Sequence, residues 1–302
     1  MATDLAGSLK DKVLFITGAA RGIGEEVARR AAAHGAHVAA VGMEPERLEK
    51  LVAELGQQTG TSHTWAECDV TDQASLDAAV ATTVRDLGGI DVVVANAGIA
   101  NHGTVATSPA DVIARVMEVN LIGVSRTVSA TVAEVEKRRG YILLVSSLAA
   151  FTALPGMAAY CGAKAGVENY GNALRFELAY RGIAVGTAHM GWIDTDLVRD
   201  VKADSSTFED TLKKLPYPLG ALTSVEDCAD AFLEGIVRRK RRIFVPKAVA
   251  LVAAARPITF SWLGDLPVLK QAKQMVPRLE EQFRKTGRTF GATSAGMGKR
   301  GV

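Results

Sequence analysis

The segment that decides the fold is Val13-Leu14-Phe15-Ile16-Thr17-Gly18-Ala19-Ala20-Arg21-Gly22-Ile23-Gly24. Its first four side chains are apolar, as is typical of a short buried strand, and a helical stretch follows the glycines as far as Ala33. Glycine in such a turn lets the backbone approach a phosphate at a helix N-terminus, where free N–H groups favour anions. The order of strand, glycine turn and helix therefore predicts a nucleotide-binding unit.

Short apolar runs and helical stretches continue to alternate along the rest of the chain. We predict further strands at residues 37–41, 63–70, 91–95, 141–145, 183–189 and 243–245. We predict helices at residues 46–55, 75–87, 110–137 and 158–181. Thr223 and Glu226 form a predicted capping box that opens one more helix, which ends near Val237. Because uncharged strands between helices indicate a parallel sheet with both faces covered, the expected fold class is α/β, a doubly wound parallel sheet of the Rossmann type.

The alternation ends near residue 246, and this point divides the chain into two parts. We expect a single domain over residues 1–246 and a helical C-terminal extension over residues 247–302. In the extension, Pro257 interrupts the apolar segment 249–263, and a helix is predicted at residues 268–285. The Gly- and Ser-rich tail is expected to be disordered from about residue 288.

One face of the predicted helix 268–285 is apolar, and Pro277 must kink or divide this helix. The apolar face is formed by Leu269, Ala272, Val276, Leu279 and Phe283. Two arrangements can bury it: packing against the domain or a partner subunit, or contact with an anionic membrane surface. We favour packing, because the apolar segment directly follows the last predicted strand, and we treat membrane contact as secondary.

The net charge of +2 conceals an uneven distribution along the chain. Residues 238–302 contain 15 lysines and arginines but 3 aspartates and glutamates, whereas the rest of the chain contains 20 and 30. A basic block of this kind can attract anionic lipid or nucleic acid. We favour a solvated helix end followed by a basic tail, and we expect no nucleic-acid partner.

Cysteine content and the chain start exclude further classes of protein. The three cysteines are far apart and form no C-x-x-C pair, so neither a disulfide framework nor a metal site is expected. Residues 1–10 lack the basic and apolar regions of a secretion signal, and the longest apolar stretch is too short to cross a bilayer. We therefore expect a cytoplasmic protein, with peripheral membrane contact as the alternative.

Further motifs follow the glycine turn in a fixed order. They are Asp69-Val70, Asn96-Ala97-Gly98, Asn120 within Val119-Asn120-Leu121, and Ser147, Tyr160 and Lys164 in the pattern S…Y-x-x-x-K. The spacing of Asn120, Ser147, Tyr160 and Lys164 is expected by chance roughly 10⁻⁴ times in a chain of this composition. With the pattern T-G-x-x-x-G-x-G at residues 17–24, the set resembles the short-chain dehydrogenase/reductase family over roughly residues 9–246.

The resemblance implies a dinucleotide-binding catalytic domain that transfers a hydride between a nicotinamide and an alcohol or carbonyl carbon. Tyr160 and Lys164 lie one helical turn apart, and a neighbouring ammonium is expected to lower the tyrosine pKa from its usual value of ~10. By resemblance, Lys164 also binds the nicotinamide ribose, and Asn120 holds a water that relays protons to Lys164. The Ser147 hydroxyl can donate to the substrate oxygen as negative charge develops.

The resemblance also implies which residues bind the cofactor. They are Gly18, Arg21, Gly22, Ile23, Gly24, Gly42, Met43, Asp69, Val70, Asn96, Ala97, Gly98, Tyr160, Lys164, Ile193 and Thr195. An acidic side chain at the end of the second strand would bind the ribose 2′-OH and select NAD, but Gly42 stands there. Arg21 can pair with a 2′-phosphate, although Glu44 lies close to that position. We therefore favour NADP over NAD.

The segment after the sixth predicted strand departs from the family pattern P-G-x-x-x-T, because Met190 replaces the proline. Met190 and Trp192 either form an apolar substrate wall or pack beneath the loop. The loop 196–222 is expected to cover the substrate, and its apolar side chains favour an apolar alcohol or carbonyl compound. These side chains are Leu197, Val198, Phe208, Leu212, Leu215, Tyr217 and Leu219.

Family members are mostly dimers or tetramers, so the resemblance implies a homo-oligomer. Two alternatives to an enzyme stay open at this point. One is a non-catalytic dinucleotide sensor on the same fold, and the other is a membrane-peripheral protein whose basic C-terminal part is the main function.

Overall fold

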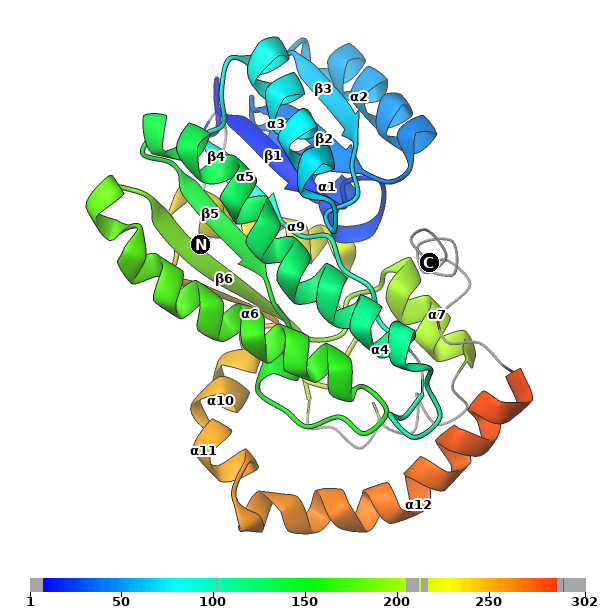
Figure 1. Cartoon of the computed structure of the whole chain (residues 1–302). Helices are drawn as coiled ribbons and strands as arrows, with labels where there is room; N and C mark the ends of the chain where they lie inside the picture. The colour runs from blue at the N-terminus through cyan, green and yellow to red at the C-terminus, as the bar shows by residue number, and fades with distance from the viewer. Residues whose placement is uncertain (1–7, 102, 205–211, 213–216, 287–289, 291–302) are drawn as a thin grey trace.

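Seven strands form one central sheet in the computed structural model, which describes residues 8–101, 103–204, 212, 217–286 and 290. The strands are β1 (Val13–Thr17), β2 (His37–Gly42), β3 (His63–Glu67), β4 (Val92–Ala95), β5 (Tyr141–Val145), β6 (Ala184–Met190) and β7 (Arg242–Val245). Their order across the sheet is β3-β2-β1-β4-β5-β6-β7, and neighbouring strands run parallel (Figure 1). The chain therefore starts in the interior of the sheet and winds outward to both edges, which confirms the predicted fold class.

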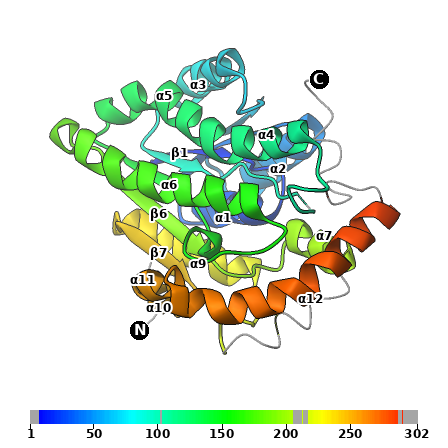
Figure 2. The ribbon, with the colours of Figure 1, turned by 60° about the horizontal axis from the view of Figure 1, so that its bottom comes forward.

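Helices cover both faces of this sheet (Figure 2). The core of one face is shared with α1 (Gly22–Ala33), α2 (Pro45–Thr59) and α9 (Val225–Val237). The core of the other face is shared with α3 (Gln73–Leu87), α4 (Ala110–Met117), α5 (Gly123–Lys137) and α6 (Ala158–Glu177). Because successive strand residues point to opposite faces, Leu14 and Ile16 of β1 enter the first core and Phe15 enters the second.

Several helix boundaries differ from the sequence predictions, and two of the differences have a clear local cause. The predicted helix 110–137 consists of α4, a π-helical segment η1 (Glu118–Ile122) and α5. The N-cap of α9 is Ser224, not Thr223: the Ser224 hydroxyl accepts a hydrogen bond from the Asp227 N–H at 3.0 Å. The capping box prediction was therefore wrong by one residue, because Thr223 instead donates its N–H to the carbonyl of Trp192 in the loop after β6.

Short elements complete the described chain. They are the 3₁₀ turns η2 (Leu148–Ala150) and η3 (Ala179–Arg181), and helix α7 (Asp196–Asp204) after β6. Three helices follow β7, namely α10 (Val249–Ala254), α11 (Arg256–Thr259) and α12 (Trp262–Thr286). Among the described helices, none has both the length and the apolar character needed to cross a bilayer.

The extension follows the prediction in part. Pro257 lies in the first turn of α11, and it separates α11 from α10 as expected. Helix α12 begins at Trp262 rather than at residue 268, and it continues through both Pro267 and Pro277. Pro277 therefore does not divide the helix, which Figure 1 shows as a curved arch. The tail predicted to be disordered lies outside the described residues, except for Phe290.

The second half of α12 packs against the rest of the molecule, but the first half does not. The Thr104 hydroxyl donates to Glu280 at 2.8 Å, which ties α12 to the loop after β4. Phe290, just beyond α12, forms a β-bridge with Asn101 and is buried in the core. By contrast, Leu269 in the first half is 56% exposed. Packing against the domain is therefore found only for the end of this helix.

A buried carboxylate links α6 to strands β6 and β7. Glu168 accepts a hydrogen bond from the Thr187 hydroxyl at 3.0 Å, lies 2.7 Å from Nε2 of His189, and forms an ion pair with Arg242. Burial acts to raise the pKa of Glu168, but the bonds and charges of His189 and Arg242 outweigh burial and lower this pKa to about 2. The ionised carboxylate therefore stabilises the folded state.

We expect this carboxylate to control acid stability. As the pH falls from about 4.5 to about 2, Glu168 takes up a proton more readily in the unfolded chain than in the folded one, and the wild type loses stability. Glu168→Gln is expected to be less stable at neutral pH by up to about 3 kcal/mol, and this deficit should shrink over that pH window. Urea denaturation of both proteins across the window measures the effect, and a deficit independent of pH would contradict it.

Candidate active site

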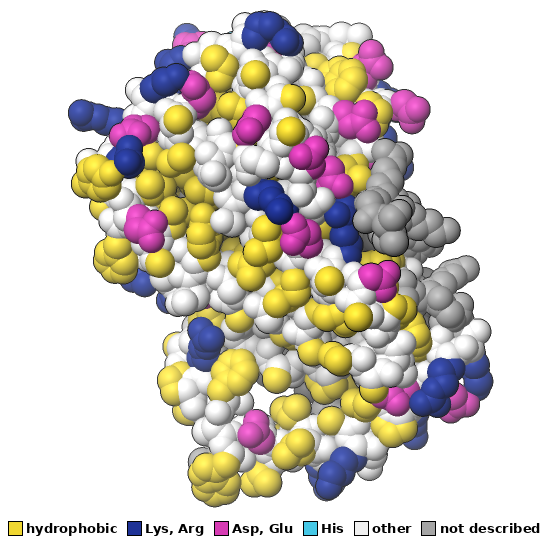
Figure 3. Space-filling model, in the orientation of Figure 1, with side chains coloured by type: hydrophobic (Ala, Val, Ile, Leu, Met, Phe, Trp, Pro, Cys, Tyr) yellow, Lys and Arg dark blue, Asp and Glu magenta, His cyan; other side chains and the backbone are white. Residues whose placement is uncertain are grey.

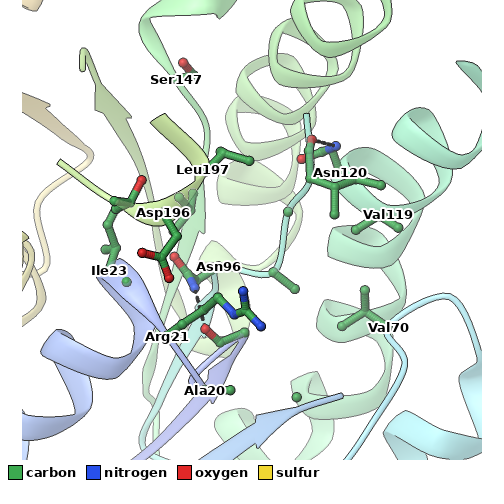
Figure 4. Close-up of a pocket in the computed structure, with 18 of the residues that line it drawn as sticks. Ala20, Arg21, Ile23, Val70, Asn96, Val119, Asn120, Ser147, Asp196 and Leu197 are labelled. Carbon is green, nitrogen blue, oxygen red and sulfur yellow. Dashed lines mark hydrogen bonds between the residues drawn. The ribbon is translucent and has the colours of Figure 1, made fainter. Parts of the chain in front are cut away.

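A pocket lies at the carboxyl ends of the strands, where sheets of this topology bind ligands. Figure 4 shows Arg21, Asn120 and Ser147 around it, each from a different part of the chain. The predicted site residues that line the pocket are Gly18, Arg21, Gly22, Ile23, Gly42, Met43, Asp69, Val70, Asn96, Ala97, Gly98, Asn120, Ser147, Tyr160, Lys164, Ile193 and Thr195. The structure thus brings together every predicted site residue except Gly24.

The first turn of α1 forms one end of this pocket. Arg21 is the N-cap residue with an extended backbone, and no side chain caps the turn. Gly18 has a φ of +66°, in the left-handed region that favours glycine, and a Cβ there would lie 3.0 Å from the Cα of Ala97. The first N–H groups of α1 therefore remain available to an anionic ligand such as a pyrophosphate.

Asn96 holds the glycine turn against β4. Its side-chain amide donates to the carbonyls of Thr17 at 3.0 Å and Gly18 at 3.3 Å. The Thr17 hydroxyl in turn accepts hydrogen bonds from the N–H groups of Asn96 and Ala97. Asn96 therefore shapes the pocket by positioning the turn.

Gly24 lies behind the turn and does not line the pocket. A Cβ at this position would overlap the Gly18 carbonyl and would lie 2.7 Å from the Asn96 amide nitrogen. The glycine permits close packing of α1 against the turn, and the binding of the cofactor by Gly24 stays a prediction.

The two charged side chains near the end of β2 pair with each other. The Arg21 guanidinium donates to both carboxylate oxygens of Glu44, with Nε 2.7 Å from Oε2. Gly42 ends β2 beside this pair, and a Cβ there would have its nearest neighbours at 3.8 to 3.9 Å. This end of the pocket therefore has both a cation and an anion, and it has room for a side chain at residue 42.

Asp69 is held by its neighbours on the same side of the pocket. Its carboxylate accepts hydrogen bonds from Thr71 at 2.7 and 2.9 Å and from Arg115 at 3.0 Å. Burial acts to raise the pKa of Asp69, but these hydrogen bonds and the charge of Arg115 lower it. Sequence analysis missed Arg115, because no pattern along α4 marks it as a partner of a residue so distant in the chain.

Tyr160 of α6 and Ser147 after β5 meet at the opposite end of the pocket. Burial raises the pKa of Tyr160 to about 12, and a hydrogen bond with Ser147 acts in the opposite direction. The expected lowering by Lys164 is not found, since the Lys164 Nζ lies 5.6 Å from the centroid of the tyrosine ring. At neutral pH the phenol is therefore protonated.

Lys164 and Asn120 lie beside Tyr160 and are more deeply buried than it. Lys164 Nζ donates to the Val145 carbonyl at 2.9 Å, and burial lowers the pKa of this amine to about 8. Asn120, in the π-helical segment η1, donates its amide to the carbonyls of Ile99 and Val116. Its Oδ1 is buried and accepts no hydrogen bond from the described residues.

Gly98 leaves open the space between these two side chains. A Cβ on Gly98 would lie 2.7 Å from Asn120 Oδ1 and 3.6 Å from Lys164 Nζ. A small polar molecule in this space could accept from the amine and donate to the amide oxygen.

The loop after β6 closes the pocket with apolar side chains. Besides Ile193 and Thr195, this part of the chain contributes Met190, Leu197 and Val198. Met190 thus lines the pocket, in agreement with the first of the two interpretations, whereas Trp192 is not among the lining residues. Sequence analysis assigned no role to His189, which is fully buried and faces Glu168. In the described part of the chain, no group of three or more metal-binding side chains is arranged to hold a metal ion.

The family model described as short chain dehydrogenase matches residues 12–206, which is more than half of the chain. The chain belongs to the short-chain dehydrogenase/reductase family. It is 36% identical over 237 residues to 2,3-dihydro-2,3-dihydroxybenzoate dehydrogenase of Bacillus subtilis (strain 168), covering 76% of this chain and 90% of the relative. As a member of this family, the protein is an oxidoreductase that acts on CH–OH or C=O groups and binds NAD(P).

Solved structures of similar proteins share the fold of this chain. A short-chain type dehydrogenase/reductase from Mycobacterium marinum superposes with a TM-score of 0.72 at 27% identity, over 81% of this chain and 97% of that one. An alcohol dehydrogenase from the archaeon Thermococcus sibiricus, complexed with 5-hydroxy-NADP, superposes with a TM-score of 0.67 at 25% identity. That match covers 77% of this chain and 95% of the archaeal enzyme.

Close packing around Gly24 predicts that a side chain at this position lowers the stability of the fold. Gly24→Ala is expected to destabilise the protein by about 1–3 kcal/mol, because the added methyl group meets backbone atoms that cannot move aside. Gly56→Ala in α2 is the matched control: nothing lies within 4 Å of a Cβ there, and this change should raise stability slightly. Urea denaturation of the two variants tests the comparison, and equal effects would contradict it.

Proposed function

We propose that this oxidoreductase reduces the carbonyl group of an apolar substrate, with NADPH as the hydride donor. The observation that carries the proposal is the grouping of Asn120, Ser147, Tyr160 and Lys164 at one end of a pocket whose other end is the uncapped start of α1. The fit to a dinucleotide is supported by the glycine cradle at Gly18 and by the uncapped N–H groups of α1.

Tyr160 would act as the proton donor. Because its pKa is about 12, the phenol is protonated at neutral pH and has a proton to give to a carbonyl oxygen that gains negative charge. The Ser147 hydroxyl, which is hydrogen-bonded to Tyr160, would donate to the same oxygen. The nicotinamide, when bound, supplies the hydride.

Lys164 and Asn120 would return the proton to Tyr160. An amine with a pKa of about 8 gains and loses a proton readily near neutral pH. A water in the space that Gly98 leaves open would connect this amine to the buried Oδ1 of Asn120. A non-catalytic sensor would need the glycine turn but not this set of four residues, so the arrangement favours an enzyme.

The apolar wall supports an apolar substrate. Met190, Ile193, Leu197 and Val198 line the same pocket as the proposed proton donor. Tyr217, which was also expected to cover the substrate, is 89% exposed. The predicted cover residues Phe208 and Leu215 lie outside the described residues.

The choice of NADPH rests on the end of β2. Residue 42, at the end of β2, is a glycine and so has no carboxylate to bind a ribose 2′-OH, and Arg21 lines the pocket beside it. The Arg21 guanidinium is hydrogen-bonded to Glu44, so a 2′-phosphate would have to replace Glu44 as its partner. In the competing arrangement, Glu44 accepts a hydrogen bond from the ribose hydroxyl of NADH.

Tyr160→Phe removes the transferable proton and keeps the ring. Turnover should fall by at least ~10²-fold, the usual scale for one general acid, with little change in cofactor affinity. Tyr170→Phe on the same helix is the control and should retain turnover, because its hydroxyl faces Ser125 on α5. Steady-state rates with a panel of carbonyl compounds and fluorescence titration with NADPH measure the two quantities. Full turnover by Tyr160→Phe would remove this residue as the acid.

Arg21→Ala should weaken NADPH binding about 10- to 150-fold and NADH binding much less, because one charged hydrogen-bonding group is lost. Gly42→Asp should shift preference towards NADH, since the space at residue 42 admits a carboxylate. Arg29→Ala, an arginine of α1 paired with Glu25 and Glu54, is the control. Dissociation constants for both cofactors give the answer. An equal loss for both in Arg21→Ala would favour recognition by Glu44 instead.

A further inference from the structure

The C-terminal extension presents an apolar surface that the rest of the described chain does not cover. We call residues 249–273, which comprise α10, α11 and the first half of α12, the arm. Its exposed large apolar side chains are Leu251, Ile258, Phe260, Trp262, Leu266, Val268 and Leu269, with exposed fractions from 39% to 73%. Monomeric soluble proteins rarely gather so many on one segment, and such patches mark interaction sites.

The arm is anchored at both ends. Val249, at the start of α10, is fully buried against Ala150 and Phe151. Beyond the arm, the second half of α12 is tied to the loop after β4 by the bond between Thr104 and Glu280. Figures 1 and 2 show the segment between these anchors as an arch at one end of the molecule. The exposure of its apolar side chains is therefore part of an ordered arrangement.

Helical spacing groups the exposed side chains of α12 on one side of the helix. Trp262, Leu266 and Leu269 are four and three residues apart, so they form one stripe along α12, which Lys273 continues. Glu280, which accepts the hydrogen bond from Thr104, lies eighteen residues from Trp262, which is five helical turns, so the stripe runs along the same side of α12. The stripe is exposed because the described domain does not cover the first half of this helix.

Charge on the arm has one predominant sign. The arm, residues 249–273, has three basic side chains, Arg256, Lys270 and Lys273, and one acidic side chain, Asp265. Figure 3 shows basic side chains beside apolar ones at the end of the molecule where the arm lies. Aromatic and aliphatic side chains bordered by lysine and arginine match the boundary between acyl chains and anionic headgroups.

We propose that the arm docks onto an anionic lipid bilayer. The stripe of Trp262, Leu266 and Leu269 enters the headgroup region, and Lys270 and Lys273 contact lipid phosphates. The pocket opens at the carboxyl edge of the sheet, the edge that α12 spans in Figure 1. Docking would therefore bring the pocket near the bilayer surface.

A second copy of the chain fits this surface less well. In a two-fold symmetric dimer the same patch meets itself, so the basic side chains of both arms would share one interface with one acidic side chain, Asp265, from each arm. Like charges facing each other across an interface oppose association. A bilayer of anionic lipid has the opposite charge, and its surface matches both the apolar stripe and the basic border.

Cosedimentation of the full chain with lipid vesicles tests the proposal. We expect binding to vesicles of equimolar phosphatidylglycerol and phosphatidylcholine, and much weaker binding to phosphatidylcholine alone. The triple change Trp262→Ser, Leu266→Ser and Leu269→Ser should reduce the bound fraction at least tenfold. Lys270→Glu with Lys273→Glu should weaken affinity by at least about 25-fold, because the loss of each basic side chain near an anionic surface costs about fivefold and each new carboxylate adds repulsion.

Two matched variants control for general loss of apolar surface and of charge. Phe176→Ser with Tyr180→Ser removes aromatic side chains that are similarly exposed on α6 and η3. Lys50→Glu with Arg85→Glu reverses two exposed charges on α2 and α3. Both should bind vesicles as the wild type does. NADPH affinity should stay unchanged in the arm variants, since no arm residue lines the pocket. The melting temperature should also stay unchanged, because the substituted side chains are exposed.

Three results would overturn the proposal. The first is the absence of binding to the anionic vesicles by the wild type. The second is equal loss of binding in the control variants and the arm variants. The third is a dimer in size-exclusion chromatography that the triple serine variant converts to a monomer, which would assign the stripe to a second copy of the chain. None of these readouts depends on the proposed carbonyl reduction, so the two proposals can fail independently.

Discussion

The hydrogen bonds between Thr17 and Asn96 are the contact on which the site depends. They join the end of β1 to the end of β4 and hold the glycine turn in a conformation that leaves the start of α1 uncapped. Gly24 permits α1 to pack closely behind this turn, because a side chain there would collide with the Gly18 carbonyl. Phosphate binding at a helix N-terminus thus depends on a contact between residues 79 positions apart in the chain.

Burial at the other end of the pocket sets the protonation of the polar groups. It raises the pKa of Tyr160 and lowers that of Lys164, so each group is biased towards its neutral form. The π-helical segment that interrupts the predicted helix 110–137 contains Asn120, whose oxygen has no partner among the described residues. Departures from regular structure at this point are typical of functional sites.

Much of the fold and of the site could be predicted from the sequence. The strands are short and mostly apolar, and the alternation with helices leaves few possible topologies. The spacing of Ser147, Tyr160 and Lys164 marked residues that the structure brings to one pocket. The capping residue of α9 was predicted one position too early, because two adjacent hydroxyl residues, Thr223 and Ser224, offer the same local signal.

What the sequence determined by itself was local or repetitive: the periodicity of its strands and helices, and the residue types at fixed spacings. Tertiary structure alone decided which charges meet, because Arg21 with Glu44, and Glu168 with Arg242, come together only through the winding of the sheet. It also decided that α12 passes through Pro277 without a break, and that one half of this helix packs while the other stays exposed. Such outcomes depend on distances between segments remote in the chain, and no local pattern encodes those distances.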